Sequence, residues 1–206
     1  MFRLASASLV ALVAVAFVQA APLKIGDRAP KFSGLECATM PGKSCSLEDL
    51  KDKDVLVFCV TCNHCPVAVA YEDRLIDFAK KYAGQDSKVM LLAFSVNTGE
   101  DDSLPKMKER AKEKGFNFPY LFDGSQKIAR DLGATRTPEF FVFNKDRRLV
   151  YHGAMDDNMK ASDVKKHYLE DAVKSALKGE TPKVETTKPQ GCGIRFAKKD
   201  DAKKDS

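Results

Sequence analysis

The sequence predicts an α/β sandwich in which a mixed sheet lies between helices. Continuous apolar runs over residues 54–60 and 89–96 indicate two strands buried on both faces, and an amphipathic helix separates them. A strand, a helix and a strand in that order give a right-handed parallel crossover. An antiparallel hairpin and a closing helix follow this unit, and a short hairpin precedes it. At 206 residues, the chain is long enough for one globular domain.

Residues 1–20 have the composition of a cleaved secretory signal. Arg3 supplies a positive start, residues 9–17 are an apolar run, and residues 18–20 (Val-Gln-Ala) suit a signal peptidase. This run is too short to cross ~30 Å of hydrocarbon at 1.5 Å per residue, which disfavours an uncleaved anchor. We therefore expect an exported protein, periplasmic or secreted, with no membrane span after cleavage.

The first predicted element of the mature chain is a β-hairpin extension. After an irregular lead-in, residues 35–38 and 44–46 flank a turn that contains Pro and Gly. Cys37 and Cys45 then face each other across this turn, which predicts a structural disulfide in an oxidising compartment. The alternative is a pair of small buried thiols. Ser46 is expected to begin a short capped helix.

The remaining elements follow from periodicity and from their end signals. Apolar residues spaced by three or four predict a helix over 66–83 between the two buried strands. Another helix is predicted over 103–114, and a short one ends at Gly133. Two further strands are predicted over 139–143 and 148–152. The last predicted helix covers 162–178, with inward residues Val164, Leu169, Ala172, Val173, Ala176 and Leu177.

The composition of the C-terminal part indicates where the domain ends. Beyond Pro182 the chain is polar, and residues 197–206 have the composition of a disordered tail. We therefore place the domain at 21–180 and a C-terminal extension, which contains Cys192, at 181–206. The net charge of +5 is modest, and no basic run is interleaved with aromatic residues. This pattern argues against a nucleic-acid partner.

The segment Cys62-Asn63-His64-Cys65 lies between the first buried strand and its helix. The N-terminus of a helix presents free N–H groups and a partial positive charge, which favour a thiolate over a thiol. A protonated His64 adds positive charge, and two cysteines at this spacing can bond with little backbone movement. We therefore expect Cys62 to attack a disulfide as a thiolate and Cys65 to resolve the mixed disulfide. A permanent disulfide or a partial metal site is the alternative.

Cys59 and Cys192 lie outside this pair. Cys59 belongs to the buried strand and is expected to be a core residue, although its spacing to Cys62 and Cys65 resembles part of an iron–sulfur motif. We expect no metal ion or other cofactor. Cys192 stands between two glycines, which suggests a loop that approaches other backbone closely. It is predicted to fold back near Cys62 as a third redox thiol, the alternative being an idle surface thiol.

Several motifs together resemble the redoxin family, the group of thioredoxin-like proteins that includes alkyl hydroperoxide reductase and thiol-specific antioxidant. They are Cys-Asn-His-Cys-Pro at 62–66, Tyr-Glu-Asp-Arg-Leu at 71–75, Arg-Thr-Pro at 136–138 and the tail segment 187–195. The resemblance spans residues 24–195 and implies a thioredoxin fold, a three-layer α/β/α sandwich. It also implies that Pro138 is a cis-proline beside the active disulfide, and that the backbone of Thr137 pairs with a bound peptide strand.

These observations predict an exported thiol–disulfide oxidoreductase that acts on a protein or small-molecule thiol or disulfide. The first alternative is a thiol-dependent peroxidase, because the resembling family includes peroxiredoxins. Those proteins carry Thr-x-x-Cys, whereas position 59 here is Cys, which argues against efficient peroxide chemistry. The second alternative is a non-enzymatic copper-binding module that keeps the fold, since thiolates suit soft ions.

Overall fold

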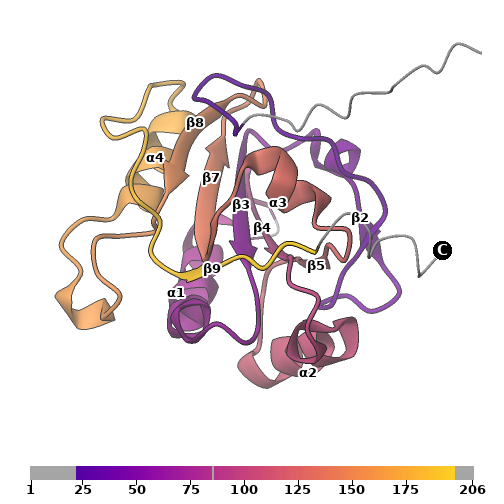
Figure 1. Ribbon diagram of the computed structural model, residues 1–206. Helices are drawn as coiled ribbons and strands as arrows, with labels where there is room; N and C mark the ends of the chain where they lie inside the picture. Colours follow the sequence, from indigo (N-terminus) through magenta and orange to yellow (C-terminus); the bar gives the residue numbers. More distant parts are fainter. Residues whose placement is uncertain (1–21, 85, 198–206) are drawn as a thin grey trace, which may run out of the picture.

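The computed structural model describes residues 22–84 and 86–197 of the chain (Figure 1). The predicted signal at residues 1–20 lies outside the described residues, as does nearly all of the predicted tail. Among the helices of the described ranges, none has the length and apolar character needed to cross a bilayer.

Five strands form the central sheet, in the order β5-β4-β3-β7-β8. β3 (Val55–Thr61) pairs in parallel with β4 (Val89–Ser95), which pairs in parallel with β5 (Tyr120–Phe122). β7 (Glu139–Phe143) runs antiparallel to β3, and β8 (Leu149–Gly153) runs antiparallel to β7. The predicted mixed sheet is therefore confirmed, and the short strand β5 is an addition to it.

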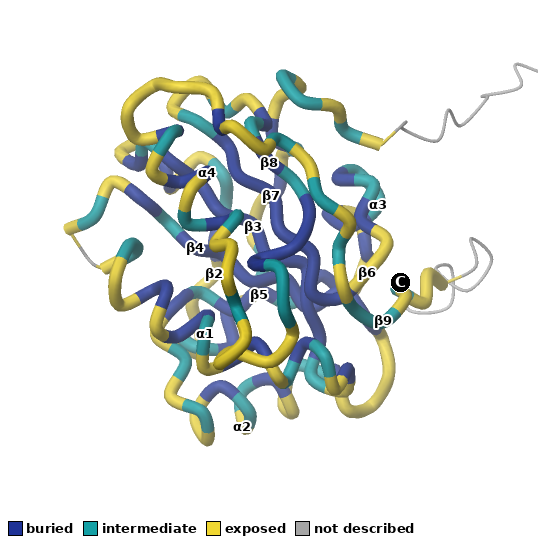
Figure 2. Tube along the Cα trace, turned by 90° about the vertical axis from the view of Figure 1, so that its left-hand side faces the viewer, coloured by how far each residue is buried: buried dark blue, intermediate teal, exposed yellow. Residues whose placement is uncertain are grey.

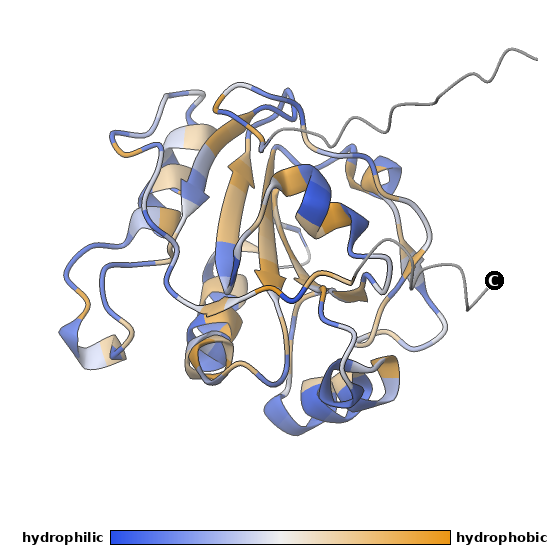
Figure 3. Cartoon of the chain, in the orientation of Figure 1, coloured by the Kyte–Doolittle hydropathy of each residue, from blue (hydrophilic) through white to orange (hydrophobic). Residues whose placement is uncertain are grey.

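Helices cover both faces of this sheet, which makes the predicted three layers. α1 (Pro66–Tyr82) and α4 (Tyr168–Leu177) pack on the face that carries Val57 and Tyr151, and α2 (Leu104–Lys114) adds to this layer. α3 (Lys127–Leu132) and the N-terminal segment pack on the opposite face. Because both faces are covered, the strands are apolar along their length (Figure 3) and almost continuously buried (Figure 2).

The N-terminal hairpin forms as predicted, and its two cysteines are described as thiols. β1 (Leu35–Glu36) pairs with β2 (Ser44–Cys45), and the 3₁₀ helix η1 (Leu47–Leu50) follows, capped by Ser46. The register sets Leu35 opposite Cys45, and the Cys37 N–H donates to the Lys43 carbonyl. Cys37 and Cys45 are therefore diagonal neighbours, for which about 7–8 Å is typical. Both are buried free thiols in this structure, and the disulfide between them stays a prediction.

The last helix begins later than its periodicity predicts. Residues 161–163 form a separate 3₁₀ turn, η3 (Ala161–Asp163), and α4 starts only at Tyr168. The side chain of Asp157 accepts the N–H groups of Lys165 and Lys166, which holds this stretch out of the helix. Val164 is consequently only half-buried and Leu177 is exposed, so both were wrongly predicted to face the core.

The described part of the C-terminal extension, residues 181–197, stays against the domain. It runs back across one end of the sheet, where β9 (Cys192–Gly193) pairs antiparallel with β6 (Arg136–Thr137). Figure 1 shows this segment in yellow, passing over the ends of β7 and β3 near the start of α1. A further element that the sequence did not predict is a 3₁₀ turn between β4 and α2, η2 (Glu100–Asp102).

Candidate active site

Cys62 and Cys65 occupy the junction between β3 and α1. Cys62 directly follows the last residue of β3, and Cys65 is the N-cap of α1, with Pro66 at the first helical position. The Cys65 sulfur accepts the N–H of Ala68 at 3.4 Å, so a thiol takes the capping role usually filled by an oxygen. Both cysteines are free and buried, and the pair is thus described in its dithiol form.

The loop before β7 places one residue against both thiols. The hydroxyl of Thr137 lies 3.3 Å from Cys62 Sγ, and its carbonyl oxygen accepts a hydrogen bond from Cys65 Sγ at 3.1 Å. The peptide bond between Thr137 and Pro138 is cis, as the family resemblance implied. Glu139 holds this loop, because its carboxylate accepts the N–H groups of Thr135 and Arg136 at 2.8 and 3.1 Å.

The electrostatics of the two thiols differ from the sequence-based expectation. Burial raises the pKa of Cys62 from 9.0 to about 11, with the negative charge of Asp102 adding to the rise and the hydrogen bond from Thr137 opposing it. Burial also acts to raise the pKa of Cys65, but hydrogen bonds from Cys192 and from the Ala68 N–H outweigh it, and the net pKa is lowered. The group at the helix N-terminus that is favoured as a thiolate is therefore Cys65 rather than Cys62.

Asp102 is a site residue that the sequence did not reveal. It lies in η2, is fully buried, and its carboxylate accepts the N–H of Asn63 at 2.6 Å and that of His64 at 3.3 Å. The other carboxylate oxygen bonds Nδ1 of His64, whose ring is partly exposed. Asp102 thus fixes the Cys62–Cys65 loop and orients the imidazole between the cysteines. No motif marks it, since the contact arises only when the β4–α2 connection folds over this loop.

Cys62, His64 and Asp102 also form a group that could hold a metal ion. One ligand atom from each lies within 4.8 Å of the others. A thiolate and an imidazole suit zinc or copper. However, the carboxylate oxygens of Asp102 already accept hydrogen bonds from Asn63 and His64, so binding through Asp102 would have to displace these contacts.

Cys192 lies beside the pair, as the sequence predicted. The thiol that affects its pKa most is that of Cys65, rather than that of Cys62. Cys192 is set opposite Thr137 in the β6–β9 register and packs against the cluster of Cys62, Cys65 and Ala68. Interaction with the Cys65 thiol and burial both raise the pKa of Cys192. Cys59, by contrast, is buried in the core on the α1 side of the sheet and does not join this cluster.

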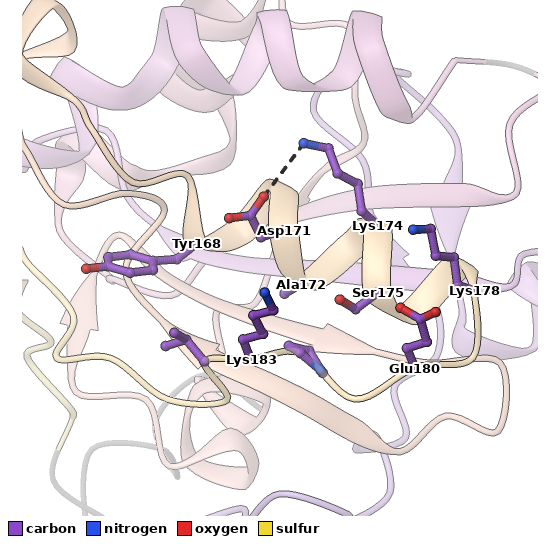
Figure 4. Close-up of a pocket in the computed structure, with 10 residues that line it drawn as sticks. Tyr168, Asp171, Ala172, Lys174, Ser175, Lys178, Glu180 and Lys183 are labelled. Carbon is purple, nitrogen blue, oxygen red and sulfur yellow. Dashed lines mark ion pairs between the residues drawn. The ribbon is translucent and has the colours of Figure 1, made fainter.

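Two clefts help to locate the chemistry. A cleft of about 360 Å³ adjoins the pair and is lined by His64, Asn97, residues 98–102 and Arg195. Another of about 360 Å³ lies between α4 and the segment that follows it (Figure 4). The second is lined by lysine, acidic and small side chains, among them Lys174, Asp171 and Ser175, and no cysteine or histidine lines it. Of these two clefts, the first is the one that adjoins the Cys62–Cys65 loop, through His64.

Two thiols one helical turn apart, at a strand-to-helix junction and beside a cis-proline loop, define a thioredoxin-fold thiol redox protein. The Redoxin family model matches residues 24–168, and the chain belongs to this family.

Solved structures agree with this assignment, whereas a search of curated proteins finds no significant match. A hypothetical protein from Sinorhizobium meliloti is 34% identical, with 87% of this chain and 98% of that chain covered and a TM-score of 0.77. An uncharacterized conserved protein from Geobacillus kaustophilus is 30% identical, with 84% and 93% covered and a TM-score of 0.77. A thioredoxin-like protein solved in its oxidized form is 20% identical, with 77% and 99% covered and a TM-score of 0.61, a likeness of fold.

Proposed function

We propose that this protein is an exported thiol–disulfide oxidoreductase that exchanges disulfides through Cys62 and Cys65. The two sulfurs lie at the start of α1, and both contact one residue of the loop before β7, Thr137. This shared contact is the observation that carries the proposal. Export is supported by the signal-like composition of residues 1–20. The substrate is a thiol or disulfide of a protein or a small molecule.

The reaction begins at Cys62, because Cys65 is fully buried and its sulfur already contacts Thr137, Ala68 and Cys192. Cys62 must lose a proton, and the structure offers His64, oriented by Asp102, as the nearby base. Cys62 attacks one sulfur of the substrate disulfide, which forms a mixed disulfide and releases the first substrate thiolate. Cys65, whose lowered pKa favours the thiolate, then attacks Cys62 and releases the second.

The test is disulfide reduction by variants of the two cysteines. With insulin as substrate and a dithiol reductant, wild type should accelerate the reduction, whereas Cys62→Ser should lose the acceleration. Cys65→Ser should instead accumulate a mixed disulfide through Cys62, because the resolving thiol is missing. Insulin reduction by Cys62→Ser at the wild-type rate would contradict the proposal.

Two alternatives give different results in the same preparations. A peroxidase would consume hydrogen peroxide with a thiol donor, yet the residue three before Cys62 is the buried Cys59 and not a threonine. We expect peroxide consumption no faster than that of free cysteine. A metal-binding module would bind copper(I) or zinc at one ion per chain through the Cys62, His64 and Asp102 group, without disulfide exchange.

A further inference from the structure

The C-terminal strand β9 occupies the edge at which a substrate strand is expected to pair. Cys192 stands opposite Thr137 and Gly193 opposite Arg136, and the N–H of Ile194 donates to the Thr135 carbonyl at 3.1 Å. By the family resemblance, the backbone of Thr137 is the group that pairs with a bound peptide. The protein therefore places a segment of its own chain, with a cysteine in it, where a substrate would lie.

This placement is built into the fold on both sides of Cys192. Gly191 approaches so closely that a Cβ at residue 191 would lie 2.5 Å from the carbonyl carbon of Thr137. Beyond the strand, the buried side chain of Gln126 donates to the carbonyl of Arg195 at 2.8 Å and accepts the N–H of Ala197 at 2.7 Å. A loop that merely passed by would need neither contact.

Three sulfurs are thus gathered at one point, and they differ in their access to solvent. Cys62 and Cys65 are 3% and 0% exposed, whereas Cys192 is half-buried. Cys192 packs against the cluster that contains the pair. An external thiol that reduces the protein consequently meets Cys192 more readily than either member of the pair.

We propose that Cys192 is a third reacting thiol, which takes the disulfide from the buried pair and presents it to an external thiol. The proposal rests on the proposed function of Cys62 and Cys65. It adds a Cys65–Cys192 disulfide as an intermediate of the same cycle.

The exchange needs no oxidant beyond the substrate disulfide. The Cys192 thiolate attacks Cys65 of the Cys62–Cys65 disulfide, the Cys65–Cys192 bond forms, and Cys62 leaves as a thiolate that takes up the proton lost by Cys192. An external thiol, deprotonated, then attacks Cys192 and releases Cys65 as a thiolate. A second external thiolate attacks the resulting mixed disulfide, which leaves Cys192 reduced and the external thiols joined in a disulfide. Each step breaks one S–S bond and forms one.

Tryptic peptides distinguish a disulfide within the pair from one that involves Cys192. Cleavage after Lys53 and Arg74 gives peptide 54–74, which holds Cys59, Cys62 and Cys65. Cleavage after Lys183 and Arg195 gives peptide 184–195, which holds Cys192. A Cys62–Cys65 disulfide is therefore a loop within one peptide, and a Cys65–Cys192 disulfide joins the two peptides.

The experiment equilibrates the full protein in buffers of reduced and oxidised glutathione, quenches it by alkylation, and digests it without reduction. We expect both the loop and the cross-link in wild type, and only the cross-link in Cys62→Ser, where Cys192 has no competitor. Cys65→Ser is the control, in which the cross-link to Cys65 is lost. Cys192→Ser should keep the loop, but glutathione should reduce it at least about tenfold more slowly than wild type. The reason is that the exposed thiol that passes the disulfide to glutathione is missing.

The outcomes distinguish a failure of the third-thiol proposal from a failure of the proposed function of Cys62 and Cys65. If the loop forms in wild type but the cross-link is absent even from Cys62→Ser, Cys192 does not react and the third-thiol proposal is wrong. If wild-type peptide 54–74 shows no loop in any buffer, the proposed function of the pair fails instead. Glutathione reduction of Cys192→Ser at the wild-type rate would also overturn the role of Cys192.

Discussion

A single methyl group at residue 191 should open the site, because β9 lies too close to Thr137 to admit it. In Gly191→Ala the added Cβ would collide with the carbonyl of Thr137 and approach the Pro138 nitrogen to 3.0 Å. Backbone atoms cannot rotate aside, so β9 must move away from β6. Gly193→Ala, in the same strand, is a matched control, since a Cβ at residue 193 meets nothing within 4 Å.

The size of the effect follows from the burial of Cys62. Burial raises its pKa from 9.0 to about 11 while β9 and Cys192 cover the pair. At pH 8 the thiolate fraction is then about one in a thousand, against about one in ten at a pKa of 9. Gly191→Ala should therefore accelerate alkylation of Cys62 by up to about a hundredfold, and Gly193→Ala by less than about twofold.

The assay is alkylation of the reduced protein by iodoacetamide at pH 8, with the modified cysteine located by mass spectrometry of peptide 54–74. Cys59 serves as an internal reference, because it is fully buried and burial raises its pKa strongly. Alkylation of Cys62 in Gly191→Ala at the wild-type rate would refute the argument that β9 keeps this thiol protonated. Equal acceleration in Gly193→Ala would show that the close approach at residue 191 is not the cause.

Three further substitutions test other parts of the structure. Thr137→Val removes the hydroxyl that lies 3.3 Å from Cys62 Sγ. Because a hydrogen bond to a charged group contributes roughly 1.5–3 kcal/mol, the pKa of Cys62 should rise and its alkylation should slow about tenfold or more. An unchanged pH–rate profile for the alkylation of Cys62 would count against this. Asp156→Asn breaks a buried ion pair with Arg74 at 2.6 Å and should lower the free energy of unfolding, measured in urea, by about 3 kcal/mol. The control is Asp171→Asn at an exposed position, which should change this free energy by less than about 0.5 kcal/mol. Burial raises the pKa of Glu139 above 4.5, so ionising it costs stability: the advantage of wild type over Glu139→Gln should be largest near pH 4 and should decline as the pH rises through the raised pKa. A wild-type advantage that instead grows with pH would reverse that sign.

Much of the fold could be predicted because its strands are buried on both faces. Such strands are continuous apolar runs, and β3 and β4 were located within one or two residues. β5 was missed because three residues are too few to show a pattern. The start of α4 was misplaced because the contacts of Asp157 with the backbone of Lys165 and Lys166 override a helical spacing that continues through this stretch.

The candidate site was predictable to the extent that it is local. Cys62, Cys65 and His64 share one turn of chain, and the position of Pro138 followed from the family resemblance. Asp102 comes from a different connection, and no spacing links it to His64. The pKa of Cys62 also depends on its burial and on Thr137 and Asp102, which come from distant parts of the chain and which a reading of the helix N-terminus alone does not include. Cys192 was foreseen because flanking glycines signal close backbone approach, and Gly191 makes that approach.

The central claim is that Cys62 and Cys65 interconvert between dithiol and disulfide. A redox titration of wild type in glutathione buffers, followed by alkylation and the mass of the intact protein, tests it most directly. We predict one reversible two-electron transition that protects two cysteines from alkylation and that no longer yields a Cys62–Cys65 disulfide in Cys65→Ser. Cys62 and Cys65 that are alkylated to the same extent in every buffer would contradict the account.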